Sequence, residues 1–240
     1  MRSDSRNREL NAGDAQQHLR TLASPDAAAI SARFFKTGPG QYGEGDVFIG
    51  VRVPAIRKVA REFRMLPLHE AECLLQSKIH EERLLALVIL VTQFQKGDDK
   101  VRKSIYDLYL AHTDRINNWD LVDLSAPQIV GGYLECRSRK PLIRLAKSAS
   151  LWERRIAILA TFHFIRRGEF DDTLKIAEML LADAEDLIHK AVGWMLREVG
   201  KRDLPSEERF LDQHHRAMPR TMLRYAIERF PQQKRLAYLE

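Results

Sequence analysis

The stretch NNWDLVD, residues 117–123, belongs to a pattern that recurs along the chain and decides its fold. Similar helix-like stretches align with it, and their equivalent positions are 36, 36, 35 and 34 residues apart: Arg83, Trp119, Arg155, Lys190 and Arg224. A nearly constant period of this size is typical of a repeated pair of helices. The sequence therefore predicts an all-α solenoid in which helix pairs stack into a superhelix.

The aligned positions also predict a binding face. Equivalent positions of stacked repeats line one wall of a solenoid, so this wall carries four cations and a tryptophan. Asp123 and Trp194 each lie four residues, one helical turn, after an aligned residue and share its face, and Arg197 follows on the same helix. Tryptophan and arginine are typical of recognition patches. We therefore predict a functional site on this concave wall.

Each residue of the cluster also has an ordinary structural explanation. Trp119 alone would more often be a core residue, and Arg155 could pair with a carboxylate of the adjacent repeat. Asp120 could cap its helix. Trp152 precedes Arg155 by three residues and is expected to pack between repeats and fix that arginine. The coincidence of position along the repeats favours the functional interpretation of the cluster.

Composition limits the class of protein. The chain has 240 residues, 45% of them hydrophobic, which is ample for a helical core. Thirty-nine Lys and Arg against 33 Asp and Glu give a net charge of +6 and a pI near 9.4, which favours polyanionic partners. Residues 1–11 are polar, and no apolar run approaches the roughly 18 residues of a membrane span. We expect a cytoplasmic protein. Cys73 and Cys136 lack metal-ligand spacing and are predicted to be core thiols in a reducing compartment.

Start and stop signals predict about twelve helices. We expect residues 1–23 to be a flexible amino-terminal segment, 24–232 a single repeat domain and 233–240 a short tail. The expected helices are 24–36, one from about 54, 66–76, 80–94, 98–111, 118–134 with a break at Pro127, 141–148, 152–167, 172–182, 186–199, 205–215 and 221–230. Five glycines make 37–50 a loop.

Other kinds of site have weaker support. The glycine-rich loop lacks the G-x-x-x-x-G-K-[ST] pattern and a preceding strand, so a plain connection is favoured over a phosphate cradle. The histidines show no ligand spacing with a carboxylate, and no nucleophile motif of an acyl transferase occurs. We therefore expect neither a metal site nor a cofactor.

At the clustered residues the chain resembles the AlkD-type DNA alkylation repair glycosylases. The segments that carry the resemblance are WDLVD (119–123), WERR (152–155), KAVGWMLRE (190–198) and the turn GVRVPAIR (50–57). The resemblance covers roughly residues 25–230. It implies a HEAT-like repeat protein that excises cationic alkylated purines, such as 3-methyladenine and 7-methylguanine, from double-stranded DNA.

The resemblance also implies roles for single residues. Asp123 matches the catalytic aspartate, Trp119 and Trp194 the flanking aromatics, and Arg155 a clamping arginine. DNA contacts are assigned to the cations of the wall and to the amino-terminal turn: Arg83, Lys190, Arg197, Arg224, Arg52, Pro54 and Arg57. The glycine-rich loop before Gly50 is longer than in the shorter family members, which leaves the amino-terminal DNA contacts open.

The residues fit this chemistry. Glycoside cleavage normally shares acid and base work between two carboxylates, whereas only Asp123 is evident here. A cationic N-alkylated base leaves as a neutral purine and needs no general acid. One anion can stabilise the oxocarbenium-like sugar and orient the attacking water. Tryptophan faces attract cations by about 0.5–2 kcal/mol. Arg155 and Lys190 would hold phosphates beside the lesion, and the family is thought to work without flipping the base.

Two other classes stay open on sequence grounds. The first is a non-catalytic relative that binds bent or branched DNA, against which the presence of Asp123 argues. The second is a HEAT-type scaffold for protein interactions, whose face should carry mostly aliphatic and acidic anchors. We expect an enzyme that acts as a monomer on DNA containing alkylated purines, with no membrane or metal partner.

Overall fold

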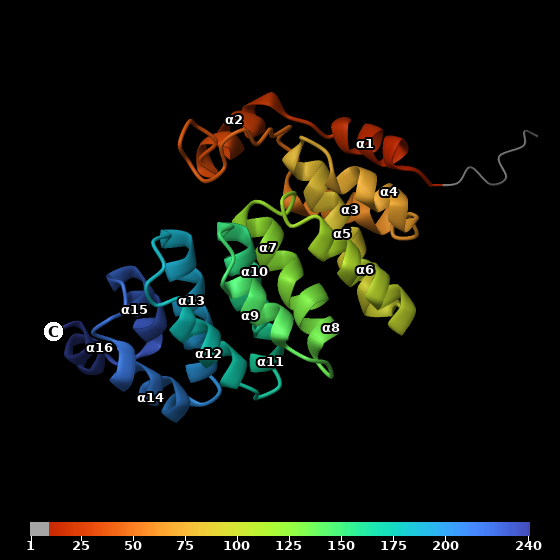
Figure 1. The fold of residues 1–240 in the computed structure, drawn as a ribbon. Coiled ribbons are helices and arrows are strands. Elements are labelled where there is room, and N and C mark those ends of the chain that lie inside the picture. Colours follow the sequence, from red (N-terminus) through yellow and green to blue (C-terminus); the bar gives the residue numbers. More distant parts are fainter. Residues whose placement is uncertain (1–9) are drawn as a thin grey trace, which may run out of the picture. The chain divides into compact units, whose positions relative to one another are not determined.

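The structure is a computed structural model that describes residues 10–240, and the regular secondary structure of this part is helical (Figure 1). Within it, the only β-type pairing is an isolated bridge between Val47 and Ile79. The all-α prediction is confirmed. The described chain forms two compact units that are divided between Leu121 and Val122. The expected bounds 24–232 of a single repeat domain stay a prediction.

The first unit is built around one long buried helix, α5. Twelve of its 17 residues are buried, and it packs against α3, α4 and α6. The helices of this unit are α1 (Ala12–Arg20), α2 (Pro25–Phe34), α3 (Val53–Glu62), α4 (Leu68–Leu75), α5 (His80–Lys96), α6 (Asp99–Ala111) and the start of α7 (Trp119–Ala126).

The amino-terminal segment differs from the flexible stretch expected over residues 1–23. Helix α1 forms inside it, begins at an Asn11 cap that accepts a hydrogen bond from the Asp14 backbone N–H, and packs on α3 and α4. Ala15 and Leu19 are fully buried at a helical spacing of four residues. The polar residues around them hide this short apolar stripe in the sequence. Residues 1–9 of that prediction lie outside the described part of the chain.

The stretch 37–50 is a loop, as expected, and its end is anchored to α5. The buried Glu81 carboxylate accepts hydrogen bonds from the backbone N–H groups of Ile49, Gly50 and Val51 at 2.8–3.3 Å. Gly50 has φ +79°, and a Cβ there would lie 2.2 Å from the Ser24 carbonyl oxygen. This position therefore requires glycine.

The second unit is built around α13, which packs against α10, α14 and α15. Its elements after α7 are η1 (Pro127–Gly131, a π-helix), α8 (Gly132–Leu134), α9 (Lys140–Ala146), α10 (Leu151–Ala160), α11 (Phe162–Ile165), α12 (Asp171–Met179), α13 (Asp186–Gly200), α14 (Leu204–His214), α15 (Arg220–Ala226), η2 (Ile227–Arg229) and α16 (Gln232–Leu239). A Cβ at Gly193 of α13 would lie 2.3 Å from the Met222 carbonyl oxygen, so glycine permits the close approach of α15.

Several local predictions are borne out and others are corrected. The break at Pro127 is present as a π turn. The helix expected over 152–167 instead ends at Ala160, because the buried Thr161 hydroxyl donates back to the Ile158 carbonyl and the chain turns there. The expected tail 233–240 lies mostly within helix α16.

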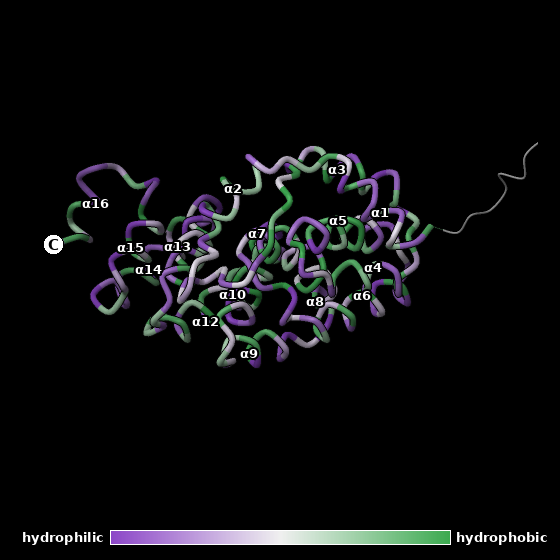
Figure 2. Tube along the Cα trace, turned by 90° about the horizontal axis from the view of Figure 1, so that it is seen from above, coloured by the Kyte–Doolittle hydropathy of each residue, from purple (hydrophilic) through white to green (hydrophobic). Residues whose placement is uncertain are grey.

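The hydropathy of the residues alternates along the helices, as expected for amphipathic helices. Hydrophilic and hydrophobic residues interleave along most of them (Figure 2). Cys73 and Cys136 are both exposed, so the prediction that they are core thiols is wrong: each lies on the solvent side of its segment. Among the described residues, no helix is both long enough and apolar enough to span a bilayer.

Candidate functional site

In the second unit, Asp123 and Arg155 form a two-pronged ion pair between α7 and α10. Arg155 Nε donates to Asp123 Oδ1 at 2.9 Å, and an Arg155 terminal nitrogen donates to Oδ2 at 2.8 Å. The other terminal nitrogen donates to the Leu187 carbonyl in the first turn of α13 at 2.5 Å. Bidentate pairs of this kind fix a carboxylate in orientation as well as in place.

The two partners of this ion pair differ in how far their side chains are buried. The Arg155 side chain is 6% exposed, whereas 19% of the Asp123 side chain reaches solvent. The guanidinium already serves a carboxylate and a backbone carbonyl, so Arg155 lies inside the wall and not on its surface. This geometry suits a residue that positions Asp123, and the phosphate contact expected of Arg155 stays a prediction.

Trp194 lies further along α13 and is half-buried. Its ring centroid is 6.0 Å from that of Phe162, and its side chain hydrogen bonds to Glu198. Burial raises the pKa of Glu198, but hydrogen bonds from Lys201, Arg202 and Trp194 outweigh it and hold that pKa below its usual range. The ring is thus fixed on two sides. Trp152, on the first turn of α10, is half-buried.

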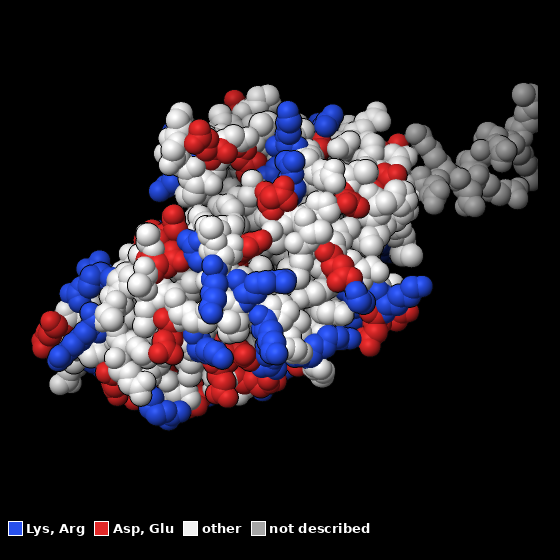
Figure 3. All heavy atoms as spheres, in the orientation of Figure 1, with Lys and Arg blue, Asp and Glu red and all other residues white. Residues whose placement is uncertain are grey.

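The cations predicted to line the second unit differ in how free they are to meet DNA. Lys190 pairs with Asp186 at 2.7 Å on its own helix, and Arg197 pairs with Glu228. Arg224 is exposed on α15. On the face drawn in Figure 3, Lys and Arg side chains gather around α9, with acidic side chains among them.

In the first unit, Trp119 belongs to an aromatic cluster. Its ring stacks on Phe35 at 5.1 Å between centroids and meets Phe34 edge-on at 5.9 Å. The Phe48 ring stacks on Phe35 and on His80, with 5.0 and 4.4 Å between ring centroids. We call Phe34, Phe35, Phe48, His80 and Trp119 the aromatic cluster. It joins the end of α2, the glycine-rich loop and the starts of α5 and α7.

His80 anchors the aromatic cluster through two carboxylates. Its Nδ1 lies 2.8 Å from Asp46 and its Nε2 2.8 Å from Asp120, and the side chain is 1% exposed. Because ionised carboxylates only accept hydrogen bonds, both ring nitrogens must donate, so the imidazole is doubly protonated. Burial lowers the pKa of His80, but the hydrogen bonds and charges of Asp120 and Asp46 outweigh burial and raise it to about 9.

Asp46 is also held by Arg83, which donates to it at 2.7 Å and to Asn117 at 3.2 Å. Burial raises the pKa of Asp46, but His80 and Arg83 outweigh burial and hold it below the usual range. The Arg83 residue is only 4% exposed. Its guanidinium is therefore paired inside the unit with Asp46 of the glycine-rich loop, and its contact with DNA stays a prediction.

The remaining assigned residues lie at the start of α3. Arg52 is the N-cap residue, and Arg52, Pro54 and Arg57 are all exposed. Proline in the first turn suits a helix start, because that position needs no backbone N–H donor. These residues are accessible to a DNA backbone.

Sequence reasoning missed the His80 network. Asp46 and Asp120 lie 34 and 40 residues from His80, so no local spacing connects them. One Asp120 oxygen accepts a hydrogen bond from the Leu121 N–H in the first turn of α7, and the other binds His80. A separation close to the repeat period was the one available signal.

Helix α7 carries Trp119 and Asp123 one turn apart, and the boundary of the two units falls within this helix.

Comparisons with known proteins bear on the family and the fold of this chain. A family model described as "DNA alkylation repair enzyme" matches residues 15–230. A solved structure of a predicted DNA alkylation repair enzyme from Enterococcus faecalis superposes with a TM-score of 0.68 at 18% identity, over 88% of this chain and 98% of that one. AlkD2 from Streptococcus mutans superposes with a TM-score of 0.52 at 16% identity, over 92% of this chain and 97% of that one. At these identities the structures show a shared fold. No curated protein matches the sequence.

Proposed function

The chain belongs to the DNA alkylation repair enzyme family, and we propose that it is a DNA N-glycosylase that excises cationic alkylated purines such as 3-methyladenine and 7-methylguanine. The observation that carries this proposal is the Asp123 carboxylate, fixed on both oxygens by Arg155 and partly open to solvent. A carboxylate held in this way is suited to act on a positive charge that develops beside it.

The reaction is hydrolysis of the bond between the sugar and the alkylated base. The electron pair of that bond leaves with the cationic base, which becomes a neutral purine, so no acid has to protonate it. Positive charge develops on the sugar, and the Asp123 anion stabilises it and accepts a proton from the attacking water. Arg155 keeps both carboxylate oxygens aimed while this happens.

Aromatic and basic side chains would hold the substrate. Trp194, fixed by Phe162 and Glu198, offers a ring face that attracts a cationic base or sugar. The role of Trp119, one turn before Asp123 on α7, stays the one that the resemblance implies. The net charge of +6 favours DNA in general. Exposed Arg52, Arg57 and Arg224 are the candidates for contacts with phosphates.

The test is the release of base from methylated duplex DNA, assayed by chromatography. Asp123→Asn keeps the size of the side chain but removes its charge, so we expect base release to fall to background while DNA binding in a gel-shift assay stays intact. The matched control is Asp183→Asn, which changes a carboxylate that is held in the same two-pronged way by Arg154.

The two measurements separate the alternatives. Excision of 7-methylguanine by Asp123→Asn at the wild-type rate would show that Asp123 is not the catalytic residue. Binding without release by the wild-type protein would favour a non-catalytic DNA-binding role. Absence of both would favour a protein-interaction scaffold.

A further inference from the structure

A groove of about 580 Å³ lies in the first unit, apart from every residue assigned to the candidate site. Its walls come from the connection between α3 and α4, the end of α5 and the start of α6. Large apolar side chains line it, and two are unusually open to solvent: Met65 is 74% exposed and Val101 41%. Exposed apolar surface that lines a groove of this kind is typical of a binding site.

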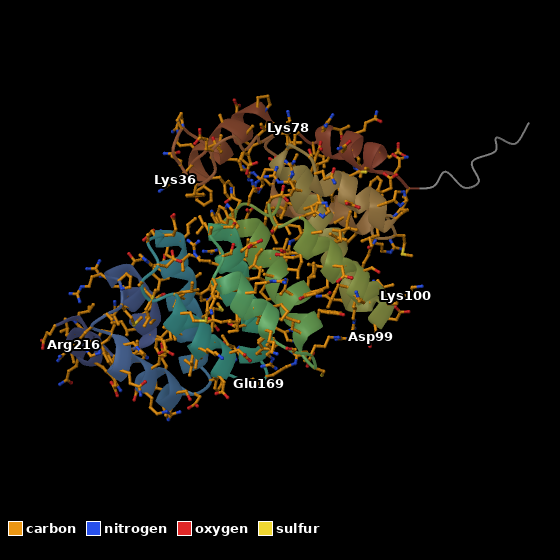
Figure 4. The ribbon with its side chains drawn as sticks, in the orientation of Figure 1. Lys36, Lys78, Asp99, Lys100, Glu169 and Arg216 are labelled. Carbon is orange, nitrogen blue, oxygen red and sulfur yellow. The ribbon has the colours of Figure 1, made fainter. Side chains whose placement is uncertain are left out.

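The rim of the groove is cationic. Arg64, Lys96 and Lys100 line it, and no carboxylate does. In the part of the chain that the structure describes, none of these three cations forms an ion pair, whereas Lys103, on the same helix as Lys100, pairs with Asp107 at 2.5 Å. Lys100 projects outward from α6 (Figure 4). The groove therefore combines an apolar floor with unneutralised positive charge.

The walls of the groove are fixed by hydrogen bonds. The Gln93 side chain donates to the backbone carbonyls of Arg64 and Leu66 at 3.1 and 2.7 Å, which ties the α3–α4 connection to α5. Asp98 caps α6 by accepting from the Val101 N–H at 2.9 Å. A Cβ at Gly97 would lie 2.5 Å from Val101 Cγ1, so the turn between α5 and α6 is tight. A preformed groove loses little entropy when it is occupied.

Charge decides between the possible occupants. Residues 1–9 of this chain contain Arg2, Arg6 and Arg8 against Asp4 and Glu9, so their charge does not complement the rim. A second copy of the chain also carries a net charge of +6. A segment rich in Asp and Glu with apolar anchor residues complements both the rim and the floor.

We propose that this groove is a docking site for an acidic peptide segment of a partner protein. An apolar side chain of the partner packs on Met65, Leu68 and Val101, and flanking carboxylates bind Arg64, Lys96 and Lys100. The groove lies outside the residues proposed for base excision, so the docking of a partner and the proposed excision are separate properties of the chain.

The probe is a fluorescein-labelled synthetic octapeptide of four aspartates, two leucines, a glutamate and a carboxy-terminal phenylalanine, titrated with the full chain by fluorescence anisotropy. In one control peptide serine replaces the leucines and phenylalanine, and in another asparagine and glutamine replace the acids. Lys96→Glu with Lys100→Glu should weaken binding by about tenfold or more, because attraction becomes repulsion at two contacts. Lys147→Glu with Lys175→Glu makes the same change in charge elsewhere on exposed residues and should leave binding unchanged.

Two further variants test the apolar floor. Ser104→Trp places a large ring in the groove and should abolish binding. Met65→Ser removes an exposed apolar side chain, so the fold is unaffected and binding should weaken. Thermal unfolding by circular dichroism confirms that each variant is folded, and the Met65 variant keeps the test valid where the tryptophan variant does not fold.

The outcomes are distinct. Saturable binding that needs both the acids and the apolar residues, and that is lost in the groove variants but not in the charge control, supports the proposal. Absence of saturation by about 1 mM overturns it, and so does binding that survives the serine peptide or the groove variants. Decanoate that binds where the peptide does not would assign the groove to an anionic amphiphile. Self-association that the groove variants abolish would assign it to a second copy.

Discussion

At the scale of single residues, a buried arginine, Arg155, holds both oxygens of the candidate catalytic carboxylate, Asp123. Asp123 is partly open to solvent, whereas Arg155 is buried, and its guanidinium links α7 and α13 to its own helix α10. The arginine therefore contributes orientation, and its substitution should affect turnover more than affinity.

We expect Arg155→Lys to lower the turnover number for base release by about 10–100-fold, because lysine keeps the charge but cannot form the two-pronged pair. The neighbouring Arg154→Lys is the matched control, since Arg154 makes the same kind of pair with Asp183. Because Arg155 is buried, the salt dependence of DNA binding should not change. A slope reduced by about one would instead show that Arg155 contacts a phosphate.

His80 gives a second prediction at this scale, on stability. Its folded pKa of about 9 lies above the ordinary value of 6.5, so its stabilising contribution is complete below about pH 6.5 and is lost as pH rises through 9. The difference in unfolding free energy between wild type and His80→Gln should shrink by up to about 3 kcal/mol between pH 6.5 and 9.5.

Urea denaturation of both proteins across that range measures this difference. Comparison of the two proteins cancels the contribution of Glu207, whose pKa burial raises to about 8 and whose ionisation also lowers stability as pH rises. Parallel pH profiles for wild type and variant would mean that His80 is neutral in the folded protein.

At the scale of elements, the glycine-rich loop proves to be a structural part of the first unit. Asp46 near its end binds His80 and Arg83, and the adjoining backbone binds Glu81. The loop thereby supports the aromatic cluster that contains Trp119. Helix signals at Ser24 and Asp98 correctly predicted where α2 and α6 begin, because capping depends on residues that are neighbours in sequence.

Two glycines of this loop allow a matched test of its anchoring. Gly45 and Gly50 both have φ +79°, but a Cβ meets nothing within 4 Å at Gly45 and lies 2.2 Å from the Ser24 carbonyl oxygen at Gly50. Gly45→Ala should cost about 1 kcal/mol of unfolding free energy, for the left-handed backbone alone. Gly50→Ala should cost several times more. Equal losses in thermal or urea unfolding would show that the contact at Ser24 relaxes freely.

At the scale of the whole molecule, the predicted strip of cations divides into buried and exposed members. Arg83 and Arg155 are buried and form ion pairs inside their units, whereas Arg224 is exposed. Fewer of the aligned cations are therefore exposed than the period implied.

We expect Arg224→Gln to weaken binding to duplex DNA about equally for all sequences and to lower the slope of log K against log salt by about one, because one phosphate contact is lost. Arg139→Gln is the control, since Arg139 already forms ion pairs with Glu169 and, at 2.5 Å, with Asp172. Gel-shift titrations at several salt concentrations give both slopes. An unchanged slope in the Arg224 variant would place that arginine away from the DNA.

The sequence by itself determined the helical class, the repeat period and the position of Asp123, because periodicity and capping are written in residues close together in the chain. Only the tertiary structure decided the partners of the charged residues. His80 meets carboxylates 34 and 40 residues away, and Arg155 meets Asp123 32 residues away. A period can place two residues on one face, but burial and pairing depend on how the helices pack. That packing brings the Arg155 guanidinium, predicted as a phosphate clamp, onto both oxygens of Asp123.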